Sequence, residues 1–381
     1  MNYLILAFLT LLPWANFIFR DMNLWLAQGH FTQLSVLAMF ACSFFIKPNC
    51  QKVKNIPLAL LVFWVGAQTL HFSAIAAKQN GYSLAMLSFF NFICLIIFYR
   101  MCVRYLNKED VKRILKYVSF SVIGMLFFVV LQKYQLSQYT KEMPGTWHPD
   151  KSKVFIAGLI GHPTQLAAYL GMCLPLFYRK KLIYILAAVL SWIIIFFWTG
   201  MSYTISASGV VIGLLVTAYY LFKTNKKLLV ALIILLSISA PFALKGSHRD
   251  FLSSSGRIAV WEKYFNESKD KFLTGRGLGI IRIMSRESKS RVRMEHAHNE
   301  FIHYHFELGF IGLLAILFVI FEWFKLKIKE SQTVIIIKSV FVGFLLNAMI
   351  IYPSHVWVVA GLAMFLYASL YVIKNEELRC Q

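Results

Sequence analysis

Long apolar stretches constrain this chain more than any other feature of its sequence. Hydrophobic residues occupy 59% of its 381 positions, which is more apolar surface than a soluble fold of this length can bury. In lipid, backbone N–H and C=O groups have no water to bind, so each stretch must pair them internally as a helix. We therefore predict one all-α, polytopic membrane domain over residues 1–381, with about twelve transmembrane helices. They are expected near 2–19, 24–46, 56–77, 82–99, 114–131, 154–178, 182–199, 203–222, 228–244, 300–324, 333–352 and 354–373.

Lysine and arginine are unevenly distributed among the connections between these stretches. The short odd-numbered connections hold only Arg20 and Lys78. The even-numbered connections hold seventeen basic residues: Lys47, Lys52, Lys54, Arg100, Arg104, Lys108, Lys112, Arg113, Arg179, Lys180, Lys181, Lys223, Lys226, Lys227, Lys325, Lys327 and Lys329. Basic connections stay in the cytoplasm, so the even-numbered connections and both termini are predicted to be cytoplasmic. Most of the net charge of +22 then serves topology, and no nucleic-acid partner is expected.

Two odd-numbered connections are long, near 132–153 and 245–299, and both are expected outside the cytoplasm. The second carries twelve Lys and Arg from Lys245 to Arg293, against six Asp and Glu counted through Glu295. Long loops cross a membrane regardless of their charge, so the predicted topology stands. The excess positive charge fits a solvated loop, a loop lying on anionic lipid headgroups, or a site for an anionic substrate.

The larger loop contains a predicted helix followed by a glycine-rich turn. The apolar positions that recur at helical spacing are Ile258, Trp261, Tyr264, Phe265 and Phe272. This pattern suits an amphipathic helix in the membrane interface, or equally a helix packed on the membrane domain. The glycines of the following TGRGLG allow a ligand to approach the backbone closely. Arg257 and Arg276 flank the helix, and their guanidinium groups suit phosphate oxygens.

The end of this loop, RMEHAHNEFIHYHFELGF, concentrates four of the chain's ten histidines: His296, His298, His303 and His305. His296 and His298 are two residues apart, so a regular helix would separate them, and no set of three or four converging metal ligands is evident. Metal binding and buried structural histidines are two alternatives. We favour a third, in which a histidine at the outer mouth of the bundle takes a proton from a hydroxyl near neutral pH.

Four motifs, spread over about residues 154–373, resemble the O-antigen ligase and polymerase superfamily and follow one another along the chain as they do in that superfamily. HAHNEFIHYHFELGFIGLLAIL resembles its His-x-His-Asn and Glu-x-Gly-x-x-Gly signature, and SGRIAVWEKYFNESKDKFLTGRGLG resembles the element that precedes it. GLIGHPTQLAAYLGMCLPL and IIYPSHVWVVAGLAMFLYASL resemble an earlier segment and the final helix. The first five apolar stretches match the superfamily only in number and hydrophobicity.

The resemblance implies a C-type glycosyltransferase fold, with a small periplasmic loop at 132–153 and a large one at 245–299. It also implies transfer of a glycan from undecaprenyl diphosphate to an acceptor hydroxyl at the periplasmic face of a bacterial inner membrane. No nucleotide sugar, cofactor or metal is expected. The implied partners are the lipid-linked glycan donor, a lipid A–core or other glycan acceptor, and membrane lipid.

The same resemblance assigns roles to individual residues. His298 is expected to activate the acceptor hydroxyl, and Arg257 and Arg276 to bind the diphosphate and stabilise charge on the leaving group. Further residues are expected to bind substrate or to support the site: His296, Asn299, Glu307, Trp261, His162, Gln165 and Arg293. For Asn299 a helix cap, and for Glu307 a bracing role, are the alternatives.

One position departs from the superfamily pattern. Many members carry an Arg after Ser early in the eighth helix, where this chain has Ala207 in YTISASGVV. We expect that the phosphate contact made by this Arg in other members is either lacking here or is supplied by Arg282, Arg291 or Arg293.

Three functions share the implied chemistry and differ in acceptor. O-antigen ligation to lipid A–core in lipopolysaccharide biosynthesis is preferred; extension by an O-antigen polymerase and transfer to a protein such as pilin are the alternatives. A lipid-linked oligosaccharide flippase is an alternative of another class. A transporter would place its charges near the bilayer midplane in repeated halves, whereas here they gather in one external loop.

Overall fold

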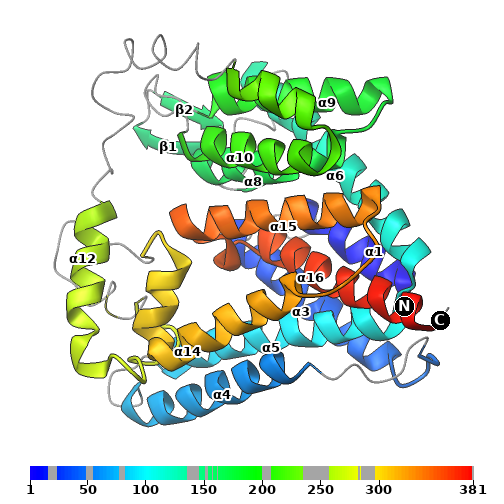
Figure 1. Cartoon of the computed structure of the whole chain (residues 1–381). Helices are drawn as coiled ribbons and strands as arrows, with labels where there is room; N and C mark the ends of the chain where they lie inside the picture. The colour runs from blue at the N-terminus through cyan, green and yellow to red at the C-terminus, as the bar shows by residue number, and fades with distance from the viewer. Residues whose placement is uncertain are drawn as a thin grey trace.

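The structure is a computed structural model of the chain. It describes residues 1–15, 24–48, 55–76, 82–134, 146–150, 153–156, 158–160, 162–199, 207–234, 257–281, 284 and 297–379. This part of the chain is predominantly helical (Figure 1). The helices before the larger loop are α1 (Asn2–Leu11), α3 (Leu24–Cys42), α4 (Ile56–Ala76), α5 (Tyr82–Tyr105), α6 (Lys108–Tyr134), α8 (Pro163–Cys173), α9 (Leu182–Ile193) and α10 (Ala207–Thr224). Those that follow are α12 (Arg257–Glu267), α14 (Glu300–Phe324), α15 (Gln332–Ile350) and α16 (Trp357–Arg379).

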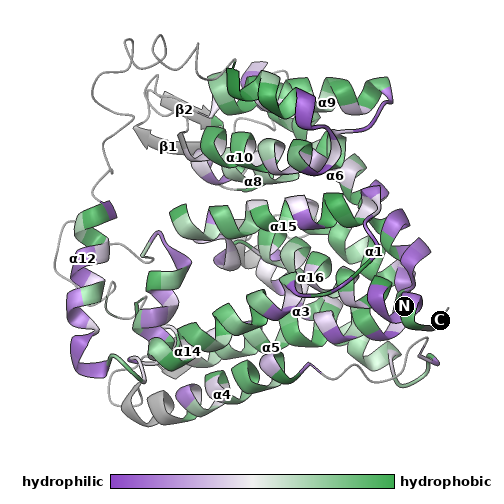
Figure 2. Ribbon diagram, viewed as in Figure 1, coloured by the Kyte–Doolittle hydropathy of each residue, from purple (hydrophilic) through white to green (hydrophobic). Residues whose placement is uncertain are grey.

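Several of these helices are long and apolar enough to cross a bilayer. Among the described residues, five meet both conditions, namely α5, α6, α14, α15 and α16, and shorter apolar helices accompany them. Apolar residues dominate the helices, and polar residues gather at their ends and on α12 (Figure 2). The architecture is that of a multi-pass membrane protein, while the number of twelve crossings stays a prediction.

Both chain termini lie at the same end of the bundle, and α12 lies at the opposite end (Figure 1). Two hydrogen bonds hold the terminal end together: Asn2 donates to the Asp110 carboxylate at 3.0 Å, and the Lys108 N–H donates to the Glu376 carboxylate at 2.7 Å. An even number of crossings requires this arrangement. Which end faces the cytoplasm stays a prediction from the charge pattern.

The helices α8, α10 and α15 pack side by side through small residues. A Cβ added to Gly209 would lie 2.5 Å from the Cβ of Ala167, and one added to Gly171 would lie 2.8 Å from the Gly209 carbonyl oxygen. Glycine at these positions lets two membrane helices approach to backbone contact. This contact anchors the end of α8 that reaches the site described below.

The helix expected over 154–178 is interrupted. Residues Lys153–Ile156 form strand β2, which pairs antiparallel with β1 (Thr146–Asp150), and a 3-10 turn, η3, follows at Gly158–Ile160. Helix α8 begins only at Pro163 and ends at Cys173, before the 3-10 turn η4 (Leu174–Phe177). Gly158 has a φ of 55°, and proline is favoured in the first turn of a helix but not in its interior, so apolarity alone overestimated this helix.

In the larger loop, α12 lies where the apolar spacing predicts a helix, and it packs on α14. Among the apolar residues that define the predicted face, Tyr264 is buried, whereas Ile258 and Phe265 are exposed. The Tyr264 ring meets the Phe306 ring edge-on, with centroids 5.1 Å apart. A 3-10 turn, η6 (Lys269–Lys271), and the TGRGLG segment then lead back to α14.

Helix α14 has a kink at Gly309, where φ is 71°, and the TGRGLG segment fills it. A Cβ on Gly275 would lie 2.4 Å from the Glu307 carbonyl oxygen, so the two backbones touch. The N–H groups of Arg276 and Gly277 donate to the carbonyl oxygens of Phe306 and Glu307 at 3.0 and 2.8 Å. The sequence suggested that these glycines let a ligand approach the backbone, but at Gly275 the group that approaches is the backbone of α14.

Candidate active site

His298 stands at the junction between the larger loop and α14. Its φ of 54° is positive, which is uncommon for a residue other than glycine and is found preferentially at functional sites. The next residue, Asn299, caps α14: its Oδ1 accepts hydrogen bonds from the N–H groups of Phe301 and Ile302 at 3.0 and 3.1 Å. Its Nδ2 donates to the Met349 carbonyl oxygen at 3.0 Å. The cap on α14 and the tie to α15 thus fix the backbone that presents His298.

Aromatic side chains hold this junction on two sides. The indole of Trp261, on α12, donates to the Ala297 carbonyl oxygen at 2.8 Å. The ring of Tyr352 meets the His298 imidazole edge-on, with centroids 5.1 Å apart. Tyr352 precedes the 3-10 turn η7 (Pro353–His355), so residues far apart in the chain share the site. It was absent from the residues that the sequence singled out; the only available signal was an aromatic residue at the head of the final motif.

Burial and two charged or titratable groups from separate elements form the electrostatic environment of His298. Burial, then the charge of Arg257, then His162, lower the pKa of His298 to about 4. The imidazole is therefore neutral near pH 7 and keeps a lone pair that can accept a proton. The structure brings together His298, Arg257 and His162, which were all selected from sequence, although they lie at the starts of three separate helices, α14, α12 and α8.

Arg257 is the first residue of α12 and is partly buried. Burial lowers its pKa, and the neighbouring Tyr352 raises it. Within the described residues, no carboxylate forms an ion pair with its guanidinium. A partly desolvated cation beside a neutral imidazole is suited to bind an anion such as phosphate.

Arg276 belongs to a different set of contacts. Its Nε and Nη2 donate to the Glu267 carbonyl oxygen at 3.1 and 2.8 Å, and Nη2 also donates to Asp270 at 2.7 Å. Its guanidinium lies 5.6 Å from the centre of the Phe306 ring. These contacts join the end of α12 to η6 and α14. Nothing among the described contacts links Arg276 to His298, so its part in the reaction stays a prediction.

Glu307 lies in the kinked part of α14 and is 1% exposed. Its Oε1 is 3.3 Å from Nε2 of His303, and its backbone oxygen accepts from Gly277. These contacts favour a bracing role for Glu307. Glu300 and Ser354, which were not selected from sequence, make a comparable link between α14 and η7 and are treated below.

Two predicted residues lie at the start of α8. His162 is its N-cap residue, and its Nδ1 is 2.8 Å from the Thr164 hydroxyl. Gln165 is 3% exposed, and neither atom of its amide has a hydrogen-bond partner among the described residues. A buried amide without a partner is costly, so Gln165 is a strong candidate for a substrate contact.

Several predicted residues fall outside the described part of the chain, namely His296, Arg282, Arg291 and Arg293. Ala207, where many superfamily members carry Arg, is the first residue of α10. Over the residues that the structure describes, no three His, Cys, Asp or Glu side chains are grouped to hold a metal ion.

Residues 164–317 match the sequence profile of a family described as O-Antigen ligase. The matched region runs from the first turn of α8 into α14 and contains Gln165, Arg257 and His298. No curated protein matches the chain. The family match confirms the resemblance that the motifs indicated.

Proposed function

Because residues 164–317 match the O-antigen ligase family, we propose that this chain is a membrane glycosyltransferase. It transfers a glycan from undecaprenyl diphosphate to an acceptor hydroxyl at the periplasmic face of a bacterial inner membrane. The preferred reaction is ligation of O-antigen to lipid A–core. The observation that carries this proposal is a neutral His298 beside Arg257, a cation with no carboxylate partner among the described residues.

The proposed reaction is a displacement at the anomeric carbon of the glycan. The acceptor oxygen attacks that carbon, the bond to the diphosphate oxygen breaks, and the lipid diphosphate leaves with the bonding electrons. His298 accepts the proton that the acceptor hydroxyl releases. Arg257 binds the diphosphate and stabilises the negative charge that grows on it as the bond breaks.

The low pKa of His298 fits this order of events. In the free protein burial and then the charge of Arg257 lower the pKa of His298 to about 4, which makes it a weak base. A bound diphosphate would add negative charge next to the imidazole and raise its pKa. His298 would then become a stronger base only when the donor is in place.

The proposed sidedness follows from the arrangement of charges and elements. The basic connections predict cytoplasmic termini. Helix α12 and the loop–α14 junction lie at the end of the bundle opposite to the termini (Figure 1). His298 and Arg257 would then face the periplasm, where a lipid-linked donor meets an external acceptor.

A reconstituted transfer assay with purified protein and lipid-linked glycan tests the proposal. His298→Gln should lower the turnover by about 100-fold or more, since it removes the proton acceptor. His305→Gln is the matched control. His305 belongs to the same motif as His298, but it packs against Phe272 and makes no described contact with His298. Equal activity of both variants would exclude His298 as the base.

The family match also supports the polymerase reaction, which uses the same donor and a different acceptor. Glycan profiling of a deletion strain separates these functions. Bare core with accumulated lipid-linked polymer identifies a ligase, and core bearing one repeat identifies a polymerase. Intact lipopolysaccharide with lost pilin glycan would identify the protein-directed enzyme instead.

A further inference from the structure

A cavity of about 560 Å³ lies inside the bundle and adjoins the candidate active site, with which it shares Tyr352 and Glu307. Helices α3, α4, α5, α14, α15 and α16 line it, and its volume is typical of a small-molecule site. Along α14 the lining extends from Glu300 to Ile320, nearly the whole helix. Most of the wall is apolar, so the cavity suits a long hydrocarbon chain.

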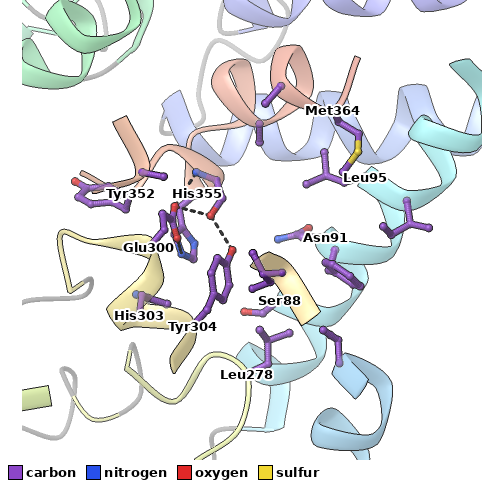
Figure 3. A pocket seen from close by; sticks show the side chains of 18 of the residues that line it. Ser88, Asn91, Leu95, Leu278, Glu300, His303, Tyr304, Tyr352, His355 and Met364 are labelled. Atoms are coloured by element: carbon purple, nitrogen blue, oxygen red, sulfur yellow. Dashed lines mark hydrogen bonds and ion pairs between the residues drawn. The ribbon is translucent and has the colours of Figure 1, made fainter. Parts of the chain in front are cut away.

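Polar groups gather at the end of the cavity nearest the larger loop (Figure 3). Glu300 Oε1 accepts hydrogen bonds from the Ser354 N–H and hydroxyl at 2.8 and 2.6 Å, and the Tyr304 hydroxyl is 2.7 Å from the same Ser354 hydroxyl. His355 Nε2 is 3.7 Å from Glu300 Oε2, which is longer than a hydrogen bond. This cluster joins the start of α14 to η7.

The second oxygen of Glu300 lacks a hydrogen-bond partner among the described residues. Glu300 is 4% exposed, and its Oε2 is fully buried. A buried carboxylate oxygen without a hydrogen bond carries a desolvation cost, which a donor group on a ligand would lower. Because the residue lines the cavity, the donor would come from the cavity's occupant.

The opposite wall offers a second polar contact. Gln33, on α3, donates to Asn91, on α5, at 2.8 Å, and Ser88 lies one turn away from Asn91. Figure 3 shows Asn91 and Ser88 across from Glu300, with Leu95 and Met364 farther from it. Both walls of the cavity therefore carry polar groups, and most of the remaining lining is apolar.

The charges of the lining decide which head group fits. Glu300 and Glu307 line the cavity with His30, His303 and His355, and its described lining contains no Lys or Arg. His303 lies 3.3 Å from Glu307 and His355 lies 3.7 Å from Glu300, so these two histidines face the carboxylates. Phosphate needs hydrogen-bond donors and positive charge, and two carboxylates would repel it. A hydroxyl group instead donates to a carboxylate. The donor's diphosphate therefore suits Arg257 and not this cavity.

We propose that the cavity binds a long-chain lipid alcohol, with its hydroxyl donating to Glu300 and its chain lying along α14 and α16. Tyr352 lines the cavity and also packs on His298, so the bound head lies next to the candidate active site. The proposal rests on the lining and not on the glycosyl transfer proposed above.

Photolabelling tests this directly. Hexadecanol with a diazirine in its chain is added to the full-length protein in nanodiscs, irradiated, and the labelled peptides are identified. The alcohol should label peptides from α14 and α16, and unlabelled hexadecanol should compete. The phosphate monoester of the same probe should label these peptides at least about 10-fold less, because its charge would be buried without a partner. Equal labelling by both probes would overturn the assignment of the head group.

Two adjacent substitutions on α14 control for labelling from the surrounding lipid. Ile316 lines the cavity, whereas Leu317 is 43% exposed and does not line it. Ile316→Trp should abolish the competed labelling, and Leu317→Trp should preserve it. If both variants remain folded by thermal unfolding and label equally, the probe binds the outer surface and the proposal fails. Neither measurement needs a glycan donor, so failure here leaves the transferase proposal intact.

Glu300→Gln provides an independent variant for the head group. It should weaken competition by hexadecanol by about 10-fold and reduce the discrimination against the phosphate monoester. Unchanged competition in a folded Glu300→Gln protein would exclude the proposed hydroxyl contact.

Discussion

The ring of Tyr352 meets the imidazole of His298 edge-on, with centroids 5.1 Å apart, and this contact joins the last motif of the chain to the histidine motif. Tyr352 also lies close enough to Arg257 to raise its pKa. One aromatic side chain therefore contacts the proposed base and influences the proposed phosphate ligand. It is expected to position both without taking part in bond making.

The first prediction concerns that positioning role. Tyr352→Phe keeps the ring and should retain turnover within about threefold, whereas Tyr352→Ala should lower it by about 10-fold or more, since small displacements of a catalytic group are costly. Steady-state transfer with both variants is the measurement. A Phe variant as inactive as the Ala variant would mean that the hydroxyl itself takes part.

The second prediction concerns pH. Because the pKa of His298 is lowered to about 4, the acidic limb of kcat/KM, which reports the free enzyme, should lie well below the ordinary histidine value of 6.5. The limb of kcat, which reports the complex, should lie at higher pH, because bound diphosphate raises the pKa. Profiles that begin below pH 4 and extend to pH 8 measure both limbs. A kcat/KM limb near 6.5 would contradict the neutral, desolvated histidine.

The third prediction separates the two arginines. Arg276→Ala removes hydrogen bonds to Glu267 and Asp270, and should lower the stability by about 1–3 kcal/mol. Arg257→Ala removes no ion pair among the described residues, so it should unfold near the wild-type temperature while losing donor use. Thermal unfolding and donor titration of both variants give the comparison. Selective loss of donor use in a stable Arg276→Ala protein would instead place Arg276 at the diphosphate.

The fourth prediction concerns the buried amide of Gln165. Gln165→Leu replaces a polar group that has no partner among the described residues, so the free protein should be as stable as wild type or more so. If the amide contacts substrate, the KM for donor or acceptor should rise by about 10-fold. Unchanged kinetics with unchanged stability would remove Gln165 from the site.

The fifth prediction concerns the backbone contact between the glycine-rich segment and α14. Gly275→Ala places a Cβ 2.4 Å from the Glu307 carbonyl oxygen at a φ of 73°, and should destabilise the protein by about 2–4 kcal/mol. Gly66→Ala is the matched control, because nothing lies within 4 Å of its added Cβ in α4. That variant should be neutral or slightly stabilising. Equal thermal stability of the two variants would contradict the tight contact at the kink.

Local features of the sequence predict much of this protein. Apolar stretches of membrane length predict α5, α6, α14, α15 and α16, because backbone pairing in lipid depends on each segment alone. The break at the start of α8 was missed because Gly158 and Pro163 act on backbone geometry, which apolarity does not measure. Four motifs taken together resembled the superfamily, and the O-antigen ligase family model matches residues 164–317.

Residue type and spacing by themselves determined which segments are helices and which residues have suitable chemistry for the site. The tertiary structure decided which of those residues meet. Arg257 and Arg276 are equivalent as phosphate ligands in sequence, yet one lies beside His298 and the other is held by Glu267 and Asp270. The neutral state of His298, its contact with Tyr352 and the cavity beside Glu300 likewise depend on burial and on neighbours distant in the chain. Desolvation and packing arise only when separate helices come together, so no single segment encodes them.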